Sequence, residues 1–304
     1  MRHWLRLISA AFALAAYASV AVAQAVVDLR KDTPRRGLLY EIKSGPKTAY
    51  LFGTLHIGKP EFYPLDAPTT AALAASKRIY LEVNLTDGAA IGSALQATMY
   101  DGTATVADAL SPALMEKVRA RLNDYPISPA AALKMKPWML AHTFLLLEAQ
   151  RRGYDPGLAS ELYLLGYAAS ANKEIRGLET LTDQFAIFDR LPAEQQQAFL
   201  EQTLAELDDQ SFEARLKALT DAWASADASA LEDALRAERE RASIYADTLL
   251  PRLIDQRNRE MAQKIEEIVR TGPPGFFAVG AFHLIGRDGI VELLRRRGLA
   301  VRQL

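Results

Sequence analysis

The sequence contains no cysteine among its 304 residues. This absence excludes disulfide bonds, thiolate nucleophiles, zinc–thiolate sites and a lipid attached to an N-terminal cysteine. A chain of this length can bury enough apolar surface to be stable without disulfides, even outside the cell. Any metal ion that the protein binds must therefore be held by histidine, aspartate or glutamate.

The sequence also lacks an excess of charge of either sign. It has 36 Lys and Arg against 37 Asp and Glu, a net charge of −1, and a pI of about 6.5. A nucleic-acid-binding protein normally presents a basic surface that neutralises phosphates. The basic run at residues 295–297 is short and typical of a solvated helix end. We therefore expect no nucleic-acid partner.

One long apolar run is present, the alanine-rich residues 7–22, which follow a basic start. The small residues Ala-Val-Ala at 21–23 predict a signal peptide over residues 1–23, with Gln24 as the new N-terminus. The run could instead be an uncleaved anchor, although it is about 16 residues long and a spanning helix needs roughly 20. We expect a periplasmic or secreted protein with no stable membrane anchor after cleavage. The oligomeric state is left open.

The hydrophobic pattern predicts a mixed α/β fold. Predicted strands lie at residues 38–42, 49–52, 78–83, 174–178, 276–279 and 299–302, the first two forming a hairpin. Predicted helices lie at residues 68–76, 155–169, 194–219, 227–270 (interrupted near Pro251) and 288–297. The strands near the two ends of the chain should share one central sheet that the helices cover. We expect a single domain over residues 24–304, with a large, mainly helical insertion at about 86–270.

Two histidines occur in the same setting. His56 ends G-T-L-H at 53–56 and His283 ends G-A-F-H at 280–283, and each motif directly follows an apolar predicted strand. Glycine lets the backbone bend at a strand end, and strand ends in α/β sheets commonly hold ligands. The repetition favours a ligand site, although two structural histidines would also fit the pattern. His142 lies in an apolar segment and is expected to be a core histidine.

Two acids and one arginine fall where their neighbours should bury them. Glu82 lies in one predicted strand and Glu179 ends another, and a buried carboxylate is costly unless it is paired or binds a metal. Arg257 borders the apolar stripe of a predicted helix and is a candidate partner. Surface strands also carry acids, and an arginine at such a border can extend to solvent, so a purely structural interpretation stays open.

Short motifs follow one another in a recognisable order. They are G-T-L-H at 53–56, Y-L-E-V-N at 80–84, K-P-W at 136–138, G-L-E-T at 177–180 followed by Gln184, R-N at 257–258, and V-G-A-F-H-L-I-G-R-D-G at 279–289. Together they resemble the TraB/PrgY/GumN family, most closely its exported GumN-like branch, over about residues 37–304. That family is similar in pattern to the Tiki proteases of animals, and more distantly to erythromycin esterases and haem-binding ChaN proteins.

The resemblance to Tiki proteins implies a metal-dependent peptidase centred on His56, His283 and Glu82, with Glu179 and Arg257 in supporting places. We hypothesise that the first three bind a divalent metal, and such nitrogen and oxygen ligands suit Mn²⁺, Co²⁺, Fe²⁺ or Zn²⁺. Glu179 would be the general base, and Arg257 would orient a carboxylate or stabilise an oxyanion, although these roles could be exchanged. The H-E-x-x-H helix of other metalloproteases is absent. The expected substrate is a peptide, or another amide or ester, in the cell envelope.

Other interpretations remain. A metal-free hydrolase would use His56 as the general base for water, as the esterase resemblance allows. A serine hydrolase is disfavoured because the chain has no G-x-S-x-G motif. A non-catalytic protein would bind haem or a metal through its loop histidines. A peptide-binding protein would sequester its ligand, as the family's link to peptide pheromones suggests, with the charged helices at 194–270 as a partner surface.

Overall fold

The computed structural model of the chain describes residues 33–304. The predicted signal peptide, its alternative as a membrane anchor and the predicted N-terminus at Gln24 all lie outside the described residues. Within residues 33–304, no helix combines the length and the apolar character needed to cross a membrane.

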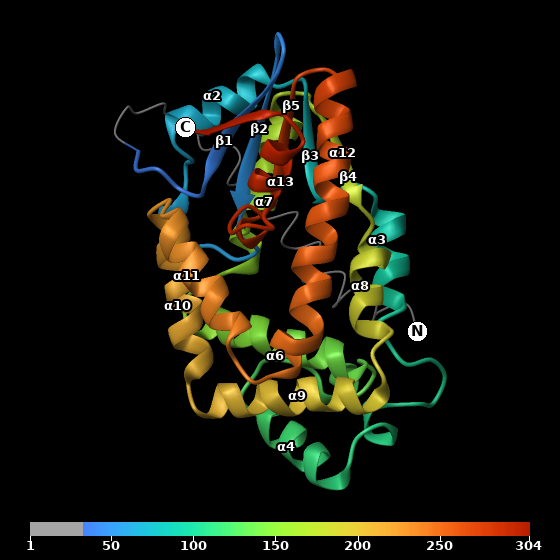
Figure 1. Cartoon of the computed structure of the whole chain (residues 1–304). Helices are drawn as coiled ribbons and strands as arrows, with labels where there is room; N and C mark the ends of the chain where they lie inside the picture. The colour runs from blue at the N-terminus through green and yellow to red at the C-terminus, as the bar shows by residue number, and fades with distance from the viewer. Residues whose placement is uncertain (1–32) are drawn as a thin grey trace.

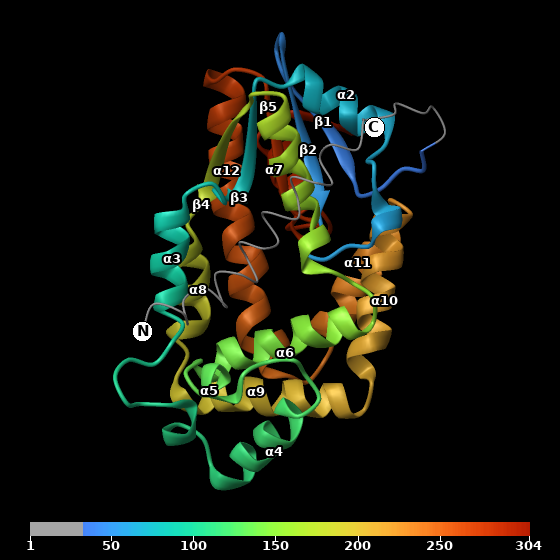
Figure 2. The ribbon, with the colours of Figure 1, turned by 180° about the vertical axis from the view of Figure 1, so that it is seen from behind.

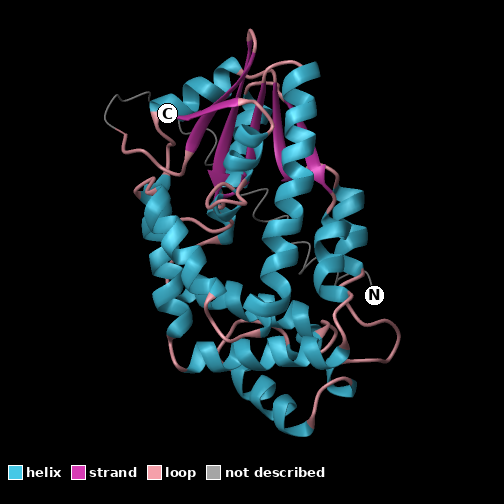
Figure 3. Cartoon of the chain, in the orientation of Figure 1, coloured by secondary structure: helices cyan, strands magenta, loops and turns pink. Residues whose placement is uncertain are grey.

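A six-stranded mixed sheet forms one end of the described structure (Figures 1 and 3). In spatial order its strands are β4 (Glu174–Glu179), β3 (Arg78–Val83), β5 (Gly275–Gly280), β2 (Lys47–Thr54), β1 (Leu39–Ser44) and β6 (Ala300–Gln303). The first four run parallel to one another, whereas β1 is antiparallel to both β2 and β6. The predicted mixed α/β fold, with a sheet shared by the two ends of the chain, is confirmed.

The strand register brings the predicted motifs to one edge of the sheet. Thr54 of β2 is paired with Gly280 of β5, and Val83 of β3 is paired with Glu179 of β4. Because these strands are parallel, all four carboxyl ends lie at the same edge, which is where open α/β sheets usually hold ligands. Both G-x-x-H loops and both strand acids therefore start from this carboxyl edge.

Helices cover both faces of the sheet. Helices α12 (Arg257–Thr271) and α13 (Ile290–Arg296) lie on the face turned to the viewer in Figure 1. Helix α7 (Ser160–Ser170) lies on the opposite face, which Figure 2 shows from the front. The buried positions of α12 recur every three or four residues, as expected of a helix with one apolar stripe. The side chains between these helices and the strands make up the larger hydrophobic core.

The middle of the chain adds a mainly helical layer beyond the carboxyl edge of the sheet. In Figures 1 and 2, α6 and α9 cross below the strands, with α10 and α11 on one side and α3 and α8 on the other. A second hydrophobic core, which includes Trp138, Phe144 and Leu200, holds this layer together. The helices of this layer and its surroundings are α2 (Ala67–Ala75), α3 (Gly88–Gln96), α4 (Pro112–Leu122), α5 (Pro129–Ala132), α6 (Pro137–Arg151), α8 (Leu181–Asp189), α9 (Ala193–Asp208), α10 (Ser211–Ala224) and α11 (Ala228–Arg239). Short 3₁₀ turns occur at η1 (Pro60–Phe62), η2 (Val106–Asp108), η3 (Pro156–Leu158) and η6 (Ala281–His283).

Two of the long predicted helices are broken at positions where no break was expected. The single helix expected over 194–219 is two helices, because Gln210 takes a left-handed conformation (φ 61°) between α9 and α10. The interruption expected near Pro251 lies instead at residues 240–243, after α11. Pro251 itself begins the second of two π-helical segments, η4 (Tyr245–Leu249) and η5 (Pro251–Gln256). The preceding residue, Leu250, is itself helical, so the chain continues through Pro251 in wider π-helical turns instead of ending there.

The middle segment is not separate from the sheet. Strand β4, predicted at 174–178, comes from within residues 86–270 and forms one edge of the sheet beside β3. Asp155-Pro156, predicted to start a helix, starts the turn η3 instead, where the Asp155 carboxylate accepts a hydrogen bond from the Gly157 N–H (2.7 Å). Helix α7 then begins at Ser160.

One buried side chain ties the helical layer to the first G-x-x-H motif. The indole Nε1 of Trp223, in α10, donates a 2.8 Å hydrogen bond to the carbonyl oxygen of Gly53. The Trp223 ring is fully buried and packs against Phe52 and Phe62, with ring centroids 6.4 and 5.3 Å apart. The position of β2 just before His56 thus depends on a tryptophan 170 residues later in the chain.

We expect Trp223→Phe to lower the free energy of unfolding by about 1–3 kcal/mol for the unpaired carbonyl alone, because a buried acceptor left without a donor pays its full desolvation cost. Trp138→Phe is the matched control: Trp138 Nε1 donates to Asp189, whose half-buried carboxylate can be rehydrated. Urea denaturation of both variants measures the difference. Equal losses of unfolding free energy would show that the hydrogen bond to Gly53 contributes no more than the one to the half-buried Asp189.

Candidate functional site

The loop that carries His56 is fixed by the start of α7. The Ser160 hydroxyl accepts a hydrogen bond from Leu55 N (2.7 Å) and donates to Leu55 O (3.1 Å), and Ser160 N also donates to Leu55 O (3.0 Å). Both backbone polar groups of Leu55, the residue before His56, are therefore held by one serine. The His56 ring itself is 70% exposed, and its Nδ1 lies 2.8 Å from a carboxylate oxygen of Glu161.

His283 is held differently, within the buried turn η6 that follows β5. Its Nδ1 lies 2.6 Å from Asn258 Oδ1, and the Asn258 Nδ2 donates to the carbonyl of Asp288 (2.9 Å). That second hydrogen bond fixes the amide with its oxygen toward the ring, so Nδ1 of neutral His283 carries the hydrogen. The remaining nitrogen, Nε2, keeps its lone pair and lies 3.6 Å from Oε1 of Glu82.

The Glu82 carboxylate links the two halves of the site. Its Oε1 accepts a 2.7 Å hydrogen bond from the backbone N–H of Gly280, at the start of the second G-x-x-H motif. Its Oε2 accepts hydrogen bonds from Gln184 Nε2 (2.9 Å) and from the Arg257 guanidinium. Sequence reasoning predicted that Glu82 needs a partner, and Arg257 is one of its partners.

Arg257 bridges the two strand acids. Its Nη2 donates to Glu82, its Nε donates to Glu179 (2.9 Å), and its Nη1 donates to the carbonyl of Leu253 (2.9 Å). Gln184 Nε2 also donates to Glu179 (3.1 Å). Arg257 is the first residue of α12, directly after the π-helical segment, and π-helical turns are frequent at functional sites.

The three predicted metal ligands converge on Gly280. A Cβ atom built on this glycine would lie 3.3 Å from Glu82 Oε1, 3.5 Å from His283 Cδ2 and 3.9 Å from His56 Nε2. Glycine therefore leaves open the point at which two histidines and a carboxylate meet. We call the seven side chains around it the Gly280 centre: His56, Glu82, Glu161, Glu179, Arg257, Asn258 and His283.

Two residues of the Gly280 centre carried no predicted role. Asn258 appeared only as part of the R-N motif and as a polar residue at the border of an apolar stripe. Glu161 was not singled out, although it is the one charged residue between Asp155 and Lys173. A single acid in the first turn of an otherwise apolar helix was the signal that could have found it. His142 lies away from this centre, against Trp138 and Phe188, and its Nδ1 contacts the Trp138 carbonyl.

The surroundings push the pKa values of the two site histidines apart. The charge of the nearby Glu161 carboxylate raises the pKa of His56 to about 9. Burial lowers the pKa of His283 to about 4, although the nearby Glu82 carboxylate acts in the other direction. Burial would raise the pKa of Glu82, but the adjacent His283, Arg257 and His56 hold it well below its usual range.

The Gly280 centre does not have the side-chain spacing of a formed metal site. Among residues 33–304, no three His, Asp or Glu side chains are grouped at metal-ligating spacing. The 3.6 Å between His283 Nε2 and Glu82 Oε1 slightly exceeds the roughly 3.0–3.4 Å between neighbouring ligands that each lie about 2.1 Å from a metal. The donor types nevertheless fit, because His56 Nε2 lies toward Gly280 and His283 Nε2 lies toward Glu82, while the Nδ1 of each ring faces a second residue.

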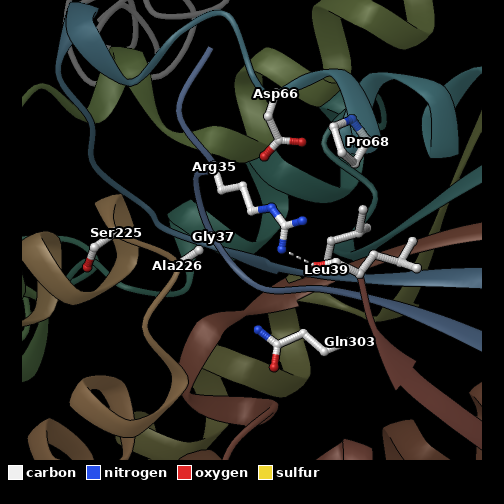
Figure 4. Close-up of a pocket in the computed structure, with 9 residues that line it drawn as sticks. Arg35, Gly37, Leu39, Asp66, Pro68, Ser225, Ala226 and Gln303 are labelled. Atoms are coloured by element: carbon white, nitrogen blue, oxygen red, sulfur yellow. Dashed lines mark hydrogen bonds between the residues drawn. The ribbon is translucent and has the colours of Figure 1, made fainter. Parts of the chain in front are cut away.

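Two surface pockets lie away from the Gly280 centre. One, of about 200 Å³, is lined by residues that include Arg35, Asp66 and Gln303, where Arg35 donates to the carbonyl of Leu304 (Figure 4). The Asp66 carboxylate there is used by backbone N–H groups of Arg36 and Thr69. This pocket therefore offers no free catalytic group.

The fold and this centre together define a mixed α/β protein with two histidines and two paired strand acids at the carboxyl edge of its sheet. The chain belongs to the TraB/PrgY/gumN family, whose model matches residues 38–303. It is similar to a Metalloprotease TIKI homolog of Nematostella vectensis (23% identity over 335 residues, covering 89% of this chain and 68% of the relative) and to Metalloprotease TIKI1 of Danio rerio (24% over 326 residues, covering 90% and 64%). The chain thus spans about two thirds of the length of these relatives. No solved structure matches it.

The pKa of His56 makes stability depend on pH above neutrality. Its pKa is about 9 in the folded protein and about 6.5 in the unfolded chain, so its stabilising effect is complete below pH 6.5 and is lost as the pH rises to 9. We expect the melting temperature to fall over this interval, and His56→Asn to reduce that fall.

The matched control for this measurement is His142→Asn. Burial lowers the pKa of His142, so its proton is already lost at neutral pH and the variant should keep the alkaline loss of the parent. Melting temperatures measured from pH 6 to 9.5 test the prediction. An unchanged alkaline slope in His56→Asn would contradict the assigned pairing of His56 with Glu161.

Proposed function

We propose that this protein is a metal-dependent hydrolase of peptidase type that acts in the cell envelope. The observation that carries the proposal is the convergence of His56, His283 and Glu82 on Gly280, with a separate residue facing the Nδ1 of each histidine. The similarity to Tiki metalloproteases supports the same chemistry. The predicted signal peptide over residues 1–23 supports export.

The charges of the Gly280 centre suit a divalent cation. Three carboxylates (Glu82, Glu161 and Glu179) face one guanidinium, that of Arg257, which leaves two negative charges when the histidines are neutral. A divalent ion held by His56, His283 and Glu82 would balance them, lower the pKa of a bound water to roughly 7 and polarise a scissile carbonyl. In the absence of a cation, protonation of His56 balances one of the two charges.

The contacts suggest how the supporting residues divide their work. Both oxygens of Glu179 are within hydrogen-bonding distance of Arg257 Nε, and Gln184 donates to one of them. A carboxylate engaged in this way is better placed to hold Arg257 than to take a proton from water. Arg257 in turn holds one oxygen of Glu82 and leaves the other facing His283. We propose that Glu179 orients Arg257, and that Arg257 orients Glu82.

The same contacts weigh against the metal-free alternative. A general base must be unprotonated at the working pH. Because Glu161 raises the pKa of His56 to about 9, His56 in the metal-free protein carries a proton at neutral pH and cannot accept another.

The first test is the metal content of the purified protein, measured by mass spectrometry after incubation with Mn²⁺, Co²⁺ or Zn²⁺. We expect close to one ion per chain in the parent and a large loss in both His56→Ala and His283→Ala. His142→Ala, which removes a histidine away from the Gly280 centre, should retain the metal. A parent protein that binds none of these ions would overturn the proposal, and titration with haem would then test the binding-protein alternative.

A second test fills the centre without removing any ligand. Gly280 has φ −49° and ψ 138°, which alanine adopts freely, so Gly280→Ala should fold but place a methyl group among the three ligands. We expect at least a tenfold loss of metal affinity with a melting temperature close to that of the parent. Gly92→Ala, on an exposed part of α3 with nothing within 4 Å of the new methyl, is the control. Full metal affinity in Gly280→Ala would place the metal elsewhere.

A further inference from the structure

We infer that Glu161 is the positioning residue of His56: its carboxylate holds the Nδ1 side of the ring against α7 and thereby turns Nε2 toward Gly280. The inference deepens the proposed function, since it says how an exposed histidine is kept ready for its role there. It starts from the 2.8 Å contact between His56 Nδ1 and Glu161 and from the position of His56 Nε2, 3.9 Å from a Cβ built on Gly280.

The environment of Glu161 gives the carboxylate no other charged partner. Both of its oxygens are buried and lack a well-aligned hydrogen bond in the described part of the chain, and its one ion pair there is with His56. A buried carboxylate is costly unless it is paired, and the side chains that offset this cost are the His56 ring, which carries the larger effect, and the Thr54 hydroxyl. Its place in the first turn of the eleven-residue helix α7 adds a favourable interaction with the helix dipole.

Glu161 is also held firmly enough to orient a neighbour. The preceding residue, Ser160, makes three hydrogen bonds to the backbone of Leu55, the residue before His56. His56 directly follows Leu55, and Glu161 directly follows Ser160. Both side chains therefore extend from backbone that these hydrogen bonds hold in place. Little movement of the one relative to the other is possible without breaking these bonds.

The two site histidines need orienting residues of different strength. The His283 side chain is only 4% exposed, so its packing restricts the ring and a neutral amide, that of Asn258, is enough to select the nitrogen that carries hydrogen. The His56 side chain is 70% exposed, so packing restricts it far less. A charged partner attracts the ring by its charge as well as by close contact, so it suits the less restricted ring.

Long-range ¹H–¹⁵N NMR of the metal-free protein tests the inference without any metal or activity. At an alkaline pH where the spectrum shows a neutral His56 ring, we expect the ring of the parent to carry its hydrogen on Nδ1, the nitrogen that faces Glu161. In Glu161→Ala the hydrogen should move mainly to Nε2, the form that free histidine prefers. The His56→Asn spectrum assigns the signals.

Metal affinity gives a second readout. Loss of a residue that orients a metal-binding histidine typically costs 10–100-fold in affinity, and we expect a loss of this order in both Glu161→Ala and Glu161→Gln. Glu148→Gln is the matched control, because Glu148 is an equally buried, ion-paired carboxylate in the helical layer, bound to Tyr125 and Arg152. It should leave both the His56 tautomer and the metal affinity as in the parent.

The outcomes separate this inference from the proposed function. A parent that binds no metal, but whose His56 tautomer changes in Glu161→Ala, supports the positioning role and overturns the metal proposal. An unchanged tautomer in Glu161→Ala overturns the positioning role, whatever the metal affinity. A metal affinity that falls equally in Glu148→Gln would also overturn it, since general destabilisation would then account for the loss.

Discussion

The site depends on the parallel pairing of β2 with β5. The two strands come from opposite ends of the chain, and the register that pairs Thr54 with Gly280 puts both G-x-x-H loops at the same height on one edge. A shift of one residue would turn His56 and His283 to different faces, because side chains alternate along a strand. The fully buried side chains Phe52, Phe276 and Phe277 make such a shift costly.

Around this pairing, the polar groups of the site are held by helices from different parts of the chain. Helix α7 supplies Ser160 and Glu161 to the first loop, and α12 supplies Asn258 to the second loop and Arg257 to the two strand acids. These two helices cover opposite faces of the sheet, so the site forms only when both layers are packed (Figures 1 and 2). Residues far apart in the sequence are thereby fixed to within hydrogen-bonding distances.

The sequence predicted the positions of the strands better than those of the long helices, because the signals for a strand lie in its own residues and its immediate neighbours. Each strand is a short apolar run bounded by clear turn residues, so its position can be read from its own residues. The break at Gln210 depends on a left-handed conformation in a polar segment that gave no glycine signal. The helical course through Pro251 depends on π-helical turns, which no simple periodicity predicts.

The residues of the candidate site likewise divide into those that a local sequence pattern predicted and one that only the packing reveals. His56, Glu82, Glu179, Arg257 and His283 were found because each departs from a local pattern: a motif repeated at a strand end, or a charge in an apolar stretch. Their convergence was expected from the resemblance but became visible only in the strand register and in the open space at Gly280. Glu161 was missed because its significance is a contact with a loop 105 positions earlier, and only the packing of α7 against that loop reveals it.

The two histidines differ in burial, so the site has a buried side and a solvent side. His283, Glu82 and Glu179 lie on the buried side, where Arg257 and Asn258 fix them from within the protein. His56 lies on the solvent side, on a loop whose backbone is fixed while its ring is 70% exposed. Of the three proposed metal ligands, His56 is therefore the one that solvent reaches most freely. Because packing restricts an exposed ring only weakly, we infer that the buried carboxylate of Glu161 keeps the solvent side of the centre as well ordered as the buried side.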